Sequence, residues 1–265
     1  SGFSIDWIRK EPASVGLLIK KDNDKNIITT GQESQGLGLG FSDLYIRKQD
    51  TLGNVLWSQN RPYSIPGGGY QPLELMIDSL NNIYLTGVLS HGQFNTQEEG
   101  FVIKYDSQGA FQWEKEFGIQ QGLTCLFGSM TIYKNKYITV AGIVDSNGLK
   151  VKAIVAQYSS GGNLNWYHLD TNSYLTRAHG LACDKFGAVY AAYASNCCPP
   201  NTTATVAKFD TLGNELWQKQ ILDSIYRYKW PSKIALDDSS YVYLLLQSVG
   251  VGTGSGTDCA VVKLD

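Results

Sequence analysis

The chain has 265 residues, of which 43% are apolar and 17% are charged, and its net charge is −2. This composition is typical of a folded globular protein and excludes a disordered chain. The charge provides no basic field for nucleic acid or an anionic membrane surface, and no apolar run approaches the roughly 20 residues of a membrane-spanning helix. With 28 glycines and 16 tyrosines, the chain suits many short strands joined by tight turns.

One segment recurs along the chain, in which an Asp or Ser is followed seven residues later by a Trp. The complete copies are DTLGNVLW at 50–57, DSQGAFQW at 106–113, SSGGNLNW at 159–166 and DTLGNELW at 210–217. A fifth copy is divided between the ends, because Trp7 would stand seven positions after Asp265 if the ends were joined. A repeat that is completed only by joining the ends is typical of a closed ring of β-sheets.

Each repeat is predicted to contain four strands. In chain order, the first strands are 16–22, 72–78, 128–133, 179–184 and 233–237, and the second strands are 26–32, 82–89, 136–144, 188–195 and 241–248. The third strands are 44–50, 100–106, 153–159, 204–210 and 259–265, and the fourth strands are 55–60, 111–117, 164–169, 215–221 and 4–10. Second and third strands are apolar on nearly every residue, which requires both of their faces to be covered. Fourth strands become polar after the Trp, which favours an outer position in contact with water.

The sequence therefore predicts an all-β fold, a five-bladed β-propeller of four-stranded antiparallel blades. The ring is expected to close by pairing the N-terminal strand, 4–10, with the C-terminal strand, 259–265. The whole chain is expected to be a single domain, with blades at 14–60, 71–118, 126–170, 177–222, and 230–265 plus 4–11. The recurring tryptophans are assigned to packing between blades because their position in the repeat never varies, and they are Trp7, Trp57, Trp113, Trp166 and Trp217.

Two segments of the second repeat, 78–87 (DSLNNIYLTG) and 101–118 (FVIKYDSQGAFQWEKEFG), resemble SBBP-type β-propeller repeats. These repeats are common in secreted bacterial proteins, especially those of the Bacteroidetes. The resemblance extends over the whole chain, although members of the family usually carry more than five blades. It implies secretion and a scaffold or binding role. Because the family has no settled common activity, the resemblance transfers no catalytic residue.

Aromatic residues in the connections between blades are the predicted ligand-binding or partner-binding residues. Some flank a Pro-Gly-Gly-Gly turn and others precede the fifth blade, and they are Tyr63, Tyr70, Tyr226, Tyr228 and Trp230, with Arg227 interleaved. Exposed aromatic rings beside hydrogen-bonding groups suit stacking on sugar rings or on a protein partner. The alternative is that they fill gaps between blades, since aromatic side chains pack most protein interiors.

Five cysteines leave at least one thiol unpaired within the chain. Cys197 and Cys198 are adjacent, and Cys183 in the same predicted blade is a candidate disulfide partner for either. No cysteine shows the spacing of a metal site, and neither a metal nor a cofactor is expected. Asn201 begins an Asn-Thr-Thr sequence, a candidate N-glycosylation site.

Carboxylates and histidines give little sign of catalysis. Most aspartates occupy repeated turn positions, including Asp22, whose surroundings up to Glu33 faintly resemble a calcium loop. Glu74 is the only glutamate on a predicted inner strand and has no evident partner, whereas a glycosidase needs two facing carboxylates. The three histidines, His91, His168 and His179, lie in different repeats without a nucleophile motif.

These observations predict a non-enzymatic scaffold, extracellular or at the cell surface, that binds and assembles through loops on the propeller faces. A fibre subunit or adhesin domain would fit, with a protein partner or a second copy of the chain and without nucleic acid or a membrane span. The alternative is a carbohydrate-binding lectin. A glycoside hydrolase is the third reading.

Overall fold

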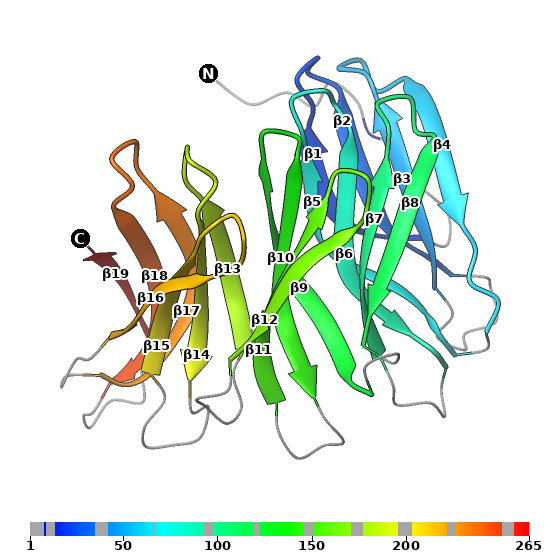
Figure 1. Cartoon of the computed structure of the whole chain (residues 1–265). Helices are drawn as coiled ribbons and strands as arrows, with labels where there is room; N and C mark the ends of the chain where they lie inside the picture. The colour runs from blue at the N-terminus through cyan, green and yellow to red at the C-terminus, as the bar shows by residue number, and fades with distance from the viewer. Residues whose placement is uncertain are drawn as a thin grey trace. The chain divides into compact units, whose positions relative to one another are not determined.

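A computed structural model (Figure 1) describes residues 8, 14–34, 42–65, 67–92, 98–118, 122–145, 151–170, 177–195, 203–221, 226–250 and 257–264. These residues form β-strands, turns and loops. None of them forms a helix long and apolar enough to cross a membrane. The chain divides into two compact units, Ser1–Glu116 (unit 1) and Phe117–Asp265 (unit 2).

Unit 1 is built from two antiparallel meanders. The first contains β1 (Ser14–Lys21), β2 (Ile27–Ser34), β3 (Ser42–Gln49) and β4 (Val55–Arg61), and the second contains β5 (Gly69–Ile77), β6 (Ile83–Ser90), β7 (Glu98–Tyr105) and β8 (Phe111–Phe117), whose last residue already belongs to unit 2. A single parallel bridge, Ser42 opposite Gly69, joins the two meanders. Between them lies one apolar core, to which Ile28 and Ile46 contribute from one side and Leu85 and Phe101 from the other.

Unit 2 contains three further antiparallel meanders. They are β9 (Thr124–Tyr133), β10 (Tyr137–Asp145), β11 (Val151–Ser159) and β12 (Leu164–Leu169), then β13 (Arg177–Cys183), β14 (Val189–Ser195), β15 (Thr203–Phe209) and β16 (Glu215–Ile221), and finally β17 (Tyr226–Leu236), β18 (Val242–Gly250) and β19 (Thr257–Leu264). Separate apolar cores fill the space between consecutive meanders. The predicted all-β class is confirmed, the first four meanders have the predicted four antiparallel strands and the last has three described strands, and the five meanders fit five blades.

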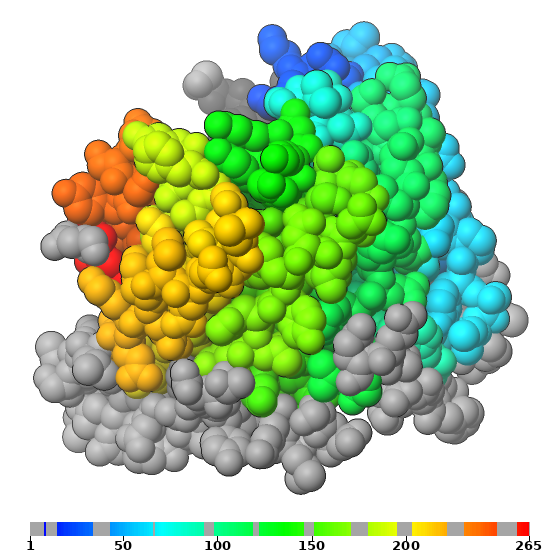
Figure 2. All heavy atoms as spheres, in the orientation of Figure 1, coloured from blue at the N-terminus to red at the C-terminus, as the bar shows by residue number. Residues whose placement is uncertain are grey.

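Burial follows the predicted gradient from inner to outer strands. Nearly every residue of β6 and β7 is buried, whereas β4, β8, β12 and β16 consist mostly of exposed and half-buried residues. Figure 2 shows β16, in gold, open to the viewer. The predicted closing strand, 4–10, falls outside the described residues except for Ile8. Among the described strands β19 pairs only with β18, so the structure does not show the ring closure.

The aspartate at the end of a first strand shapes the turn that follows it. Asp78 Oδ1 accepts hydrogen bonds from the backbone N–H groups of Leu80 and Asn82, both at 2.9 Å. Asp22 Oδ1 accepts the same pair of bonds, from Asp24 and Asn26, and its other oxygen lies 2.8 Å from Lys48 Nζ. The resemblance of this segment to a calcium loop is therefore explained by turn geometry.

The first two of these turns also contact each other directly. Asn23 Nδ2 donates to the carbonyl of Asp78 at 2.9 Å and to Asn81 Oδ1 at 2.7 Å, and Asn81 Nδ2 donates to Asp24 Oδ2 at 2.7 Å. These bonds join the two meanders of unit 1 at the end where β1 and β5 finish.

The recurring tryptophans pack on the glycine of the equivalent hairpin one meander further along. A Cβ atom added to Gly109, whose φ is +80°, would lie 2.7 Å from the Trp57 ring, and one added to Gly213, whose φ is +87°, would lie 2.6 Å from the Trp166 ring. Trp166 Nε1 also donates to the carbonyl of Thr211 at 3.3 Å. Both tryptophans therefore have the predicted role in packing between sheets. Trp7 lies outside the described residues.

Candidate functional site

Polar side chains gather at one end of unit 1, where β4, β6 and β8 finish and where β5 and β7 begin. In an antiparallel meander the end of one strand lies beside the start of the next, so residues distant in sequence meet there. Three glutamates, Glu99, Glu114 and Glu116, form what we call the carboxylate cluster. The side chains around them are Arg61, Tyr63, Tyr70 and His91.

Glu114 is the buried member that carries a cationic partner. Its side chain is only 7% exposed, and its Oε2 forms an ion pair with the guanidinium of Arg61. Arg61 also donates from Nε to the Tyr70 hydroxyl at 3.0 Å and lies 4.6 Å from the centre of the Phe111 ring. Burial raises the pKa of Glu114, and the Arg61 charge acts in the opposite direction. The other oxygen, Oε1, is buried without a hydrogen-bond partner among the described residues.

Glu99 belongs to a hydrogen-bonded chain that crosses between the two meanders. Its Oε2 lies 2.8 Å from His91 Nε2, and His91 Nδ1 lies 2.9 Å from the Tyr63 hydroxyl. Tyr63 follows β4 and is held by its own backbone N–H, which donates to Asp43 Oδ1 at 2.9 Å. Its ring also packs edge-on against Tyr70, with 5.7 Å between ring centres.

Glu116 is the exposed member of the carboxylate cluster. Partial burial raises its pKa, and the neighbouring carboxylates of Glu114 and Glu99 raise it further. Glu116 therefore keeps its proton more readily than an isolated glutamate does.

Spacing along β8 places Glu114 and Glu116 on one face of the strand. Alternate residues of a strand point to the same side, and two residues span roughly 6.6 Å of strand. One end of unit 1 thus presents an exposed carboxyl group with a raised pKa beside a carboxylate paired with Arg61. This arrangement suits general acid–base chemistry. In the described part of the chain, no three His, Cys, Asp or Glu residues are placed to hold a metal ion.

The structure brings two of the predicted binding residues into this site. Tyr63 is half-buried beside His91, whereas Tyr70 is only 4% exposed and belongs to the core, so its ring is not an exposed stacking surface. The remaining four residues lie on β17, where the backbone is described and the side chains are not, and they are Tyr226, Arg227, Tyr228 and Trp230.

Of the other predicted site residues, Cys183 carries a free thiol. Its candidate partners Cys197 and Cys198 lie outside the described residues, as does Asn201. The disulfide and the glycosylation site stay predictions.

Sequence reasoning missed the carboxylate cluster, although the repeat contains a signal for part of it. Glu114 and Glu116 stand one and three positions after Trp113. The corresponding pairs in the other complete copies carry no acid, and they are Ser58 and Asn60, Tyr167 and Leu169, and Gln218 and Gln220. Aligning the copies and comparing the charge at these two positions would have pointed to the second repeat.

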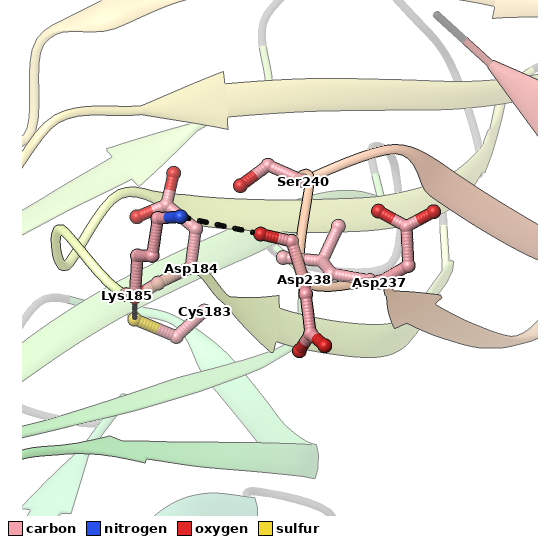
Figure 3. A pocket seen from close by; sticks show the side chains of 7 residues that line it. Cys183, Asp184, Lys185, Asp237, Asp238 and Ser240 are labelled. Atoms are coloured by element: carbon pink, nitrogen blue, oxygen red, sulfur yellow. Dashed lines mark hydrogen bonds between the residues drawn. The ribbon is translucent and has the colours of Figure 1, made fainter.

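A separate hollow of about 450 Å³ lies in unit 2 between the turn after β13 and the turn after β17 (Figure 3). The Oδ1 atoms of Asp184 and Asp237 are already occupied by backbone N–H groups of their turns. Lys185 donates to the Asp238 carbonyl at 3.3 Å, while the Asp238 carboxylate points away from it in Figure 3. Burial raises the pKa of the Cys183 thiol to about 12. The hollow therefore offers no activated nucleophile.

Comparison with known proteins gives matches among solved structures. No protein-family model matches the chain, and no curated protein matches it significantly. A protein of unknown function from Dyadobacter fermentans shares 13% identity at a TM-score of 0.59, over 97% of this chain and 81% of the other. The α-L-arabinanase of Penicillium chrysogenum, solved with arabinobiose, shares 9% identity at a TM-score of 0.51, over 96% and 94%. A puromycin hydrolase shares 9% identity at a TM-score of 0.53, over 88% of this chain but only 36% of its own.

Identities this low show the fold alone, and the fold is a β-propeller. Membership of the SBBP-type family is not confirmed by these comparisons.

The prediction of a non-enzymatic scaffold is contradicted. Two of the three similar structures are enzymes, an arabinanase and a puromycin hydrolase, and a protein partner finds no support. The prediction rested on the lack of facing carboxylates, whereas Glu99, Glu114 and Glu116 gather at one end of unit 1. It failed because these carboxylates come from different strands, and Glu114 was taken for a residue of the wet outer rim.

Proposed function

We propose that this chain is a glycoside hydrolase whose reacting groups lie in the carboxylate cluster of unit 1. The observation that carries the proposal is the pair Glu114 and Glu116. The two side chains share one face of β8 but have different surroundings, since Glu114 is buried and paired with Arg61 whereas Glu116 is exposed and its pKa is raised by burial and by the neighbouring carboxylates. Environments that separate two carboxyl groups in this way assign them the roles of base and acid.

In this mechanism Glu116 donates its proton to the oxygen of the departing sugar as the glycosidic C–O bond breaks. A water molecule attacks the anomeric carbon and gives its proton to Glu114. The buried Oε1 of Glu114 needs a donor, and this water would supply one. The distance between the two carboxyl groups decides whether the anomeric centre is inverted or retained, and the product anomer reports the outcome.

The structural likeness extends over more of the arabinanase than of the puromycin hydrolase, and this favours glycans over other hydrolase substrates. The chain spans 94% of the arabinanase but only 36% of the puromycin hydrolase. The arabinanase was solved with arabinobiose. We therefore place arabinose-containing oligosaccharides first among the substrates to be tested.

The test is incubation of purified protein with arabinan, xylan and galactan oligosaccharides, with the product anomer read by proton NMR. Cleavage is expected with the wild type and should disappear in the double variant Glu114→Gln/Glu116→Gln. Glu98→Gln is the matched control, because Glu98 lies on β7 beside Glu99 but on the opposite face. Cleavage by the double variant would exclude the carboxylate cluster as the active site. Sugar binding without cleavage by the wild type would favour the lectin alternative.

We further propose that the chain is a secreted or cell-surface SBBP-type propeller, a single domain with the five predicted blades closed by strand 4–10 on strand 259–265. Among the described strands the outer edge of β19 has no partner, and this supports the proposal, because an unpaired edge would expose backbone donors and acceptors. Deleting residues 1–10 is expected to lower the melting temperature by roughly 5–10 °C, as loss of a few kcal/mol does in a chain of this size. Deleting residues 1–3 alone is the control. An unchanged melting curve after the longer deletion would contradict closure.

A further inference from the structure

The third meander, β9 to β12, differs in charge from the other four at the end where its first and third strands finish. In the other repeats the turn after the first strand begins with an aspartate, and these residues are Asp22, Asp78, Asp184 and Asp237. The turns after the third strands likewise begin with Asp50, Asp106 and Asp210. The third repeat has Tyr133 and Ser159 at these positions, and its two turns contain Lys134 and Lys136 and no acid. This end of the third meander is therefore positively charged.

The turn between β9 and β10 exposes both lysines. Lys134 and Asn135 have φ values of +47° and +56°, and the Lys136 N–H donates to the Tyr133 carbonyl at 2.9 Å. This is a tight turn of the kind in which both central residues have positive φ. The side chains of Lys134 and Lys136 are exposed to solvent. The hairpin therefore fixes the backbone from which the two charges extend.

Aromatic rings hold the two ammonium groups in place. Lys134 Nζ lies 5.1 Å from the centre of the Tyr133 ring, and Lys136 Nζ lies 4.9 Å from the centre of the Tyr137 ring. The two rings are nearly parallel, at 9°, with 6.5 Å between their centres. An ammonium group within about 6 Å of a ring centre is attracted to the ring face. The rings therefore restrict the lysines, and less conformational entropy is lost when a ligand binds them.

The neighbouring turn, after β13, extends this surface within unit 2. The Tyr133 hydroxyl donates to the carbonyl of Lys185 at 3.2 Å, and a Cβ atom added to Gly187 would lie 2.8 Å from the Tyr133 ring. Lys185 Nζ lies 5.4 Å from the centre of the Phe186 ring, and Phe186 is 72% exposed. We call the resulting surface the basic patch, and its residues are Tyr133, Lys134, Lys136, Tyr137, Lys185 and Phe186.

Acidic neighbours do not neutralise the basic patch. Among the described residues, none of its three lysines forms an ion pair. Asp184 is buried, its Oδ1 accepts two backbone N–H groups of its turn, and its Oδ2 lies 3.7 Å from Lys208 Nζ. Lys185 donates to the Asp238 carbonyl, whereas the Asp238 carboxylate points away from it (Figure 3). Three ammonium groups can therefore contact an anionic ligand.

We propose that the basic patch binds an acidic polysaccharide, a chain of uronic acids whose carboxylates pair with the lysines and whose sugar rings stack on Phe186. The exposed ring of Phe186 offers an apolar face for the C–H groups of a sugar. Three lysines bordered by turns that begin with aspartate suit a few carboxylates, whereas nucleic acid binding depends on many phosphate contacts. The choice of a glycan among anionic ligands rests on the proposed function, and the patch itself does not.

The experiment measures binding of oligogalacturonate to the full chain by isothermal titration calorimetry at several salt concentrations. The comparison ligands are the methyl-esterified oligomer, which has the same sugar chain without the charges, polyglutamate, and a single-stranded oligonucleotide. Oligogalacturonate is expected to bind at least about tenfold more tightly than any of the three, because it alone offers both carboxylates and sugar rings. Absence of binding would overturn the proposal. Equal affinity for any comparison ligand would do so too.

The double variant Lys134→Gln/Lys136→Gln tests the charges. It is expected to bind oligogalacturonate about tenfold more weakly and with a smaller salt dependence, because two exposed charge pairs are lost. Lys25→Gln is the matched control, since Lys25 is also an exposed turn lysine with positive φ, +69°, but lies beside Asp24 in an acidic turn. Wild-type affinity in the double variant would contradict the proposal.

Phe186→Ala tests the stacking of a sugar ring. This variant is expected to bind oligogalacturonate about fivefold more weakly and polyglutamate as the wild type does, because only the sugar stacks on the ring. Leu80→Ala is the matched control, since Leu80 occupies the same turn position in the second repeat and is 66% exposed. An equal loss for both ligands, or no loss for either, would reject the glycan as the ligand.

These outcomes are separable from those of the proposed function. Glu114→Gln/Glu116→Gln, which should abolish cleavage, is expected to keep the wild-type affinity for oligogalacturonate. Binding of oligogalacturonate by a protein that cleaves no glycan would reject the hydrolase and keep the basic patch. Glycan cleavage by a protein that does not bind oligogalacturonate would do the reverse.

Discussion

Glu116→Gln is expected to lower kcat on oligosaccharides by about 10²–10⁴-fold, the contribution of a positioned general acid. The loss arises because a departing sugar oxygen is a poor leaving group without a proton. On dinitrophenyl glycosides, whose leaving group needs no proton, the same variant should lose far less activity. Steady-state rates on the two kinds of substrate measure the difference.

Glu114→Gln is the comparison that separates the two roles. A base that activates water is needed whatever the leaving group, so this variant should lose activity on both kinds of substrate. Equal losses on both substrates in Glu116→Gln would contradict its role as the acid. Thermal unfolding of each variant serves as the control for folding.

Arg61→Met is expected to destabilise unit 1, and more strongly at neutral than at acid pH. Without the guanidinium, Glu114 keeps a buried carboxylate with no cation beside it. Breaking a buried pair in this way costs about 3–5 kcal/mol, and about 2–3 kcal/mol is expected here because the Arg61 side chain is 31% exposed.

The sign of the pH dependence follows from the raised pKa of Glu114. A folded-state pKa above the unfolded value of about 4.3 means that the folded state holds its proton more tightly. The variant's deficit should therefore be small below that pH and should grow as the pH rises through the folded-state pKa. Urea unfolding at about pH 4 and about pH 7.5 measures it. Lys115→Met, an exposed change on the other face of β8, is the control. A deficit larger at acid pH would contradict this account.

The repeat predicted those parts of the fold that depend on local sequence. Asp78 and its equivalents predicted turns because a carboxylate can accept two nearby backbone N–H groups without help from elsewhere. Strand order and the buried inner strands followed from apolar runs of strand length, which need cover on both faces. The residue patterns behind these features recur in each copy, so each copy supports the same predicted turns and strands.

The carboxylate cluster could not be predicted in the same way, because its contacts cross between copies. Strand periodicity places Glu114 and Glu116 on one face of β8, but it does not show that Arg61 from the preceding meander covers Glu114. The inference of a wet outer strand is right for Lys115 and wrong for Glu114, whose side chain is buried. His91 directly follows β6 and Glu99 lies eight residues later on β7, and only the register of β6 against β7 brings them together.

The single bridge between Ser42 and Gly69 has a mechanical consequence for unit 1. The two meanders share almost no backbone hydrogen bonds. A force that separates them is therefore resisted by their apolar core and by polar side-chain contacts near the two ends of β5. At one end Asn23 and Asn81 join the meanders through their side-chain amides. At the other end lie the Arg61–Glu114 ion pair and Glu116, whose pKa is raised by burial and by the neighbouring carboxylates. Unit 1 would therefore loosen at the carboxylate cluster as Glu116 loses its proton in more alkaline solution.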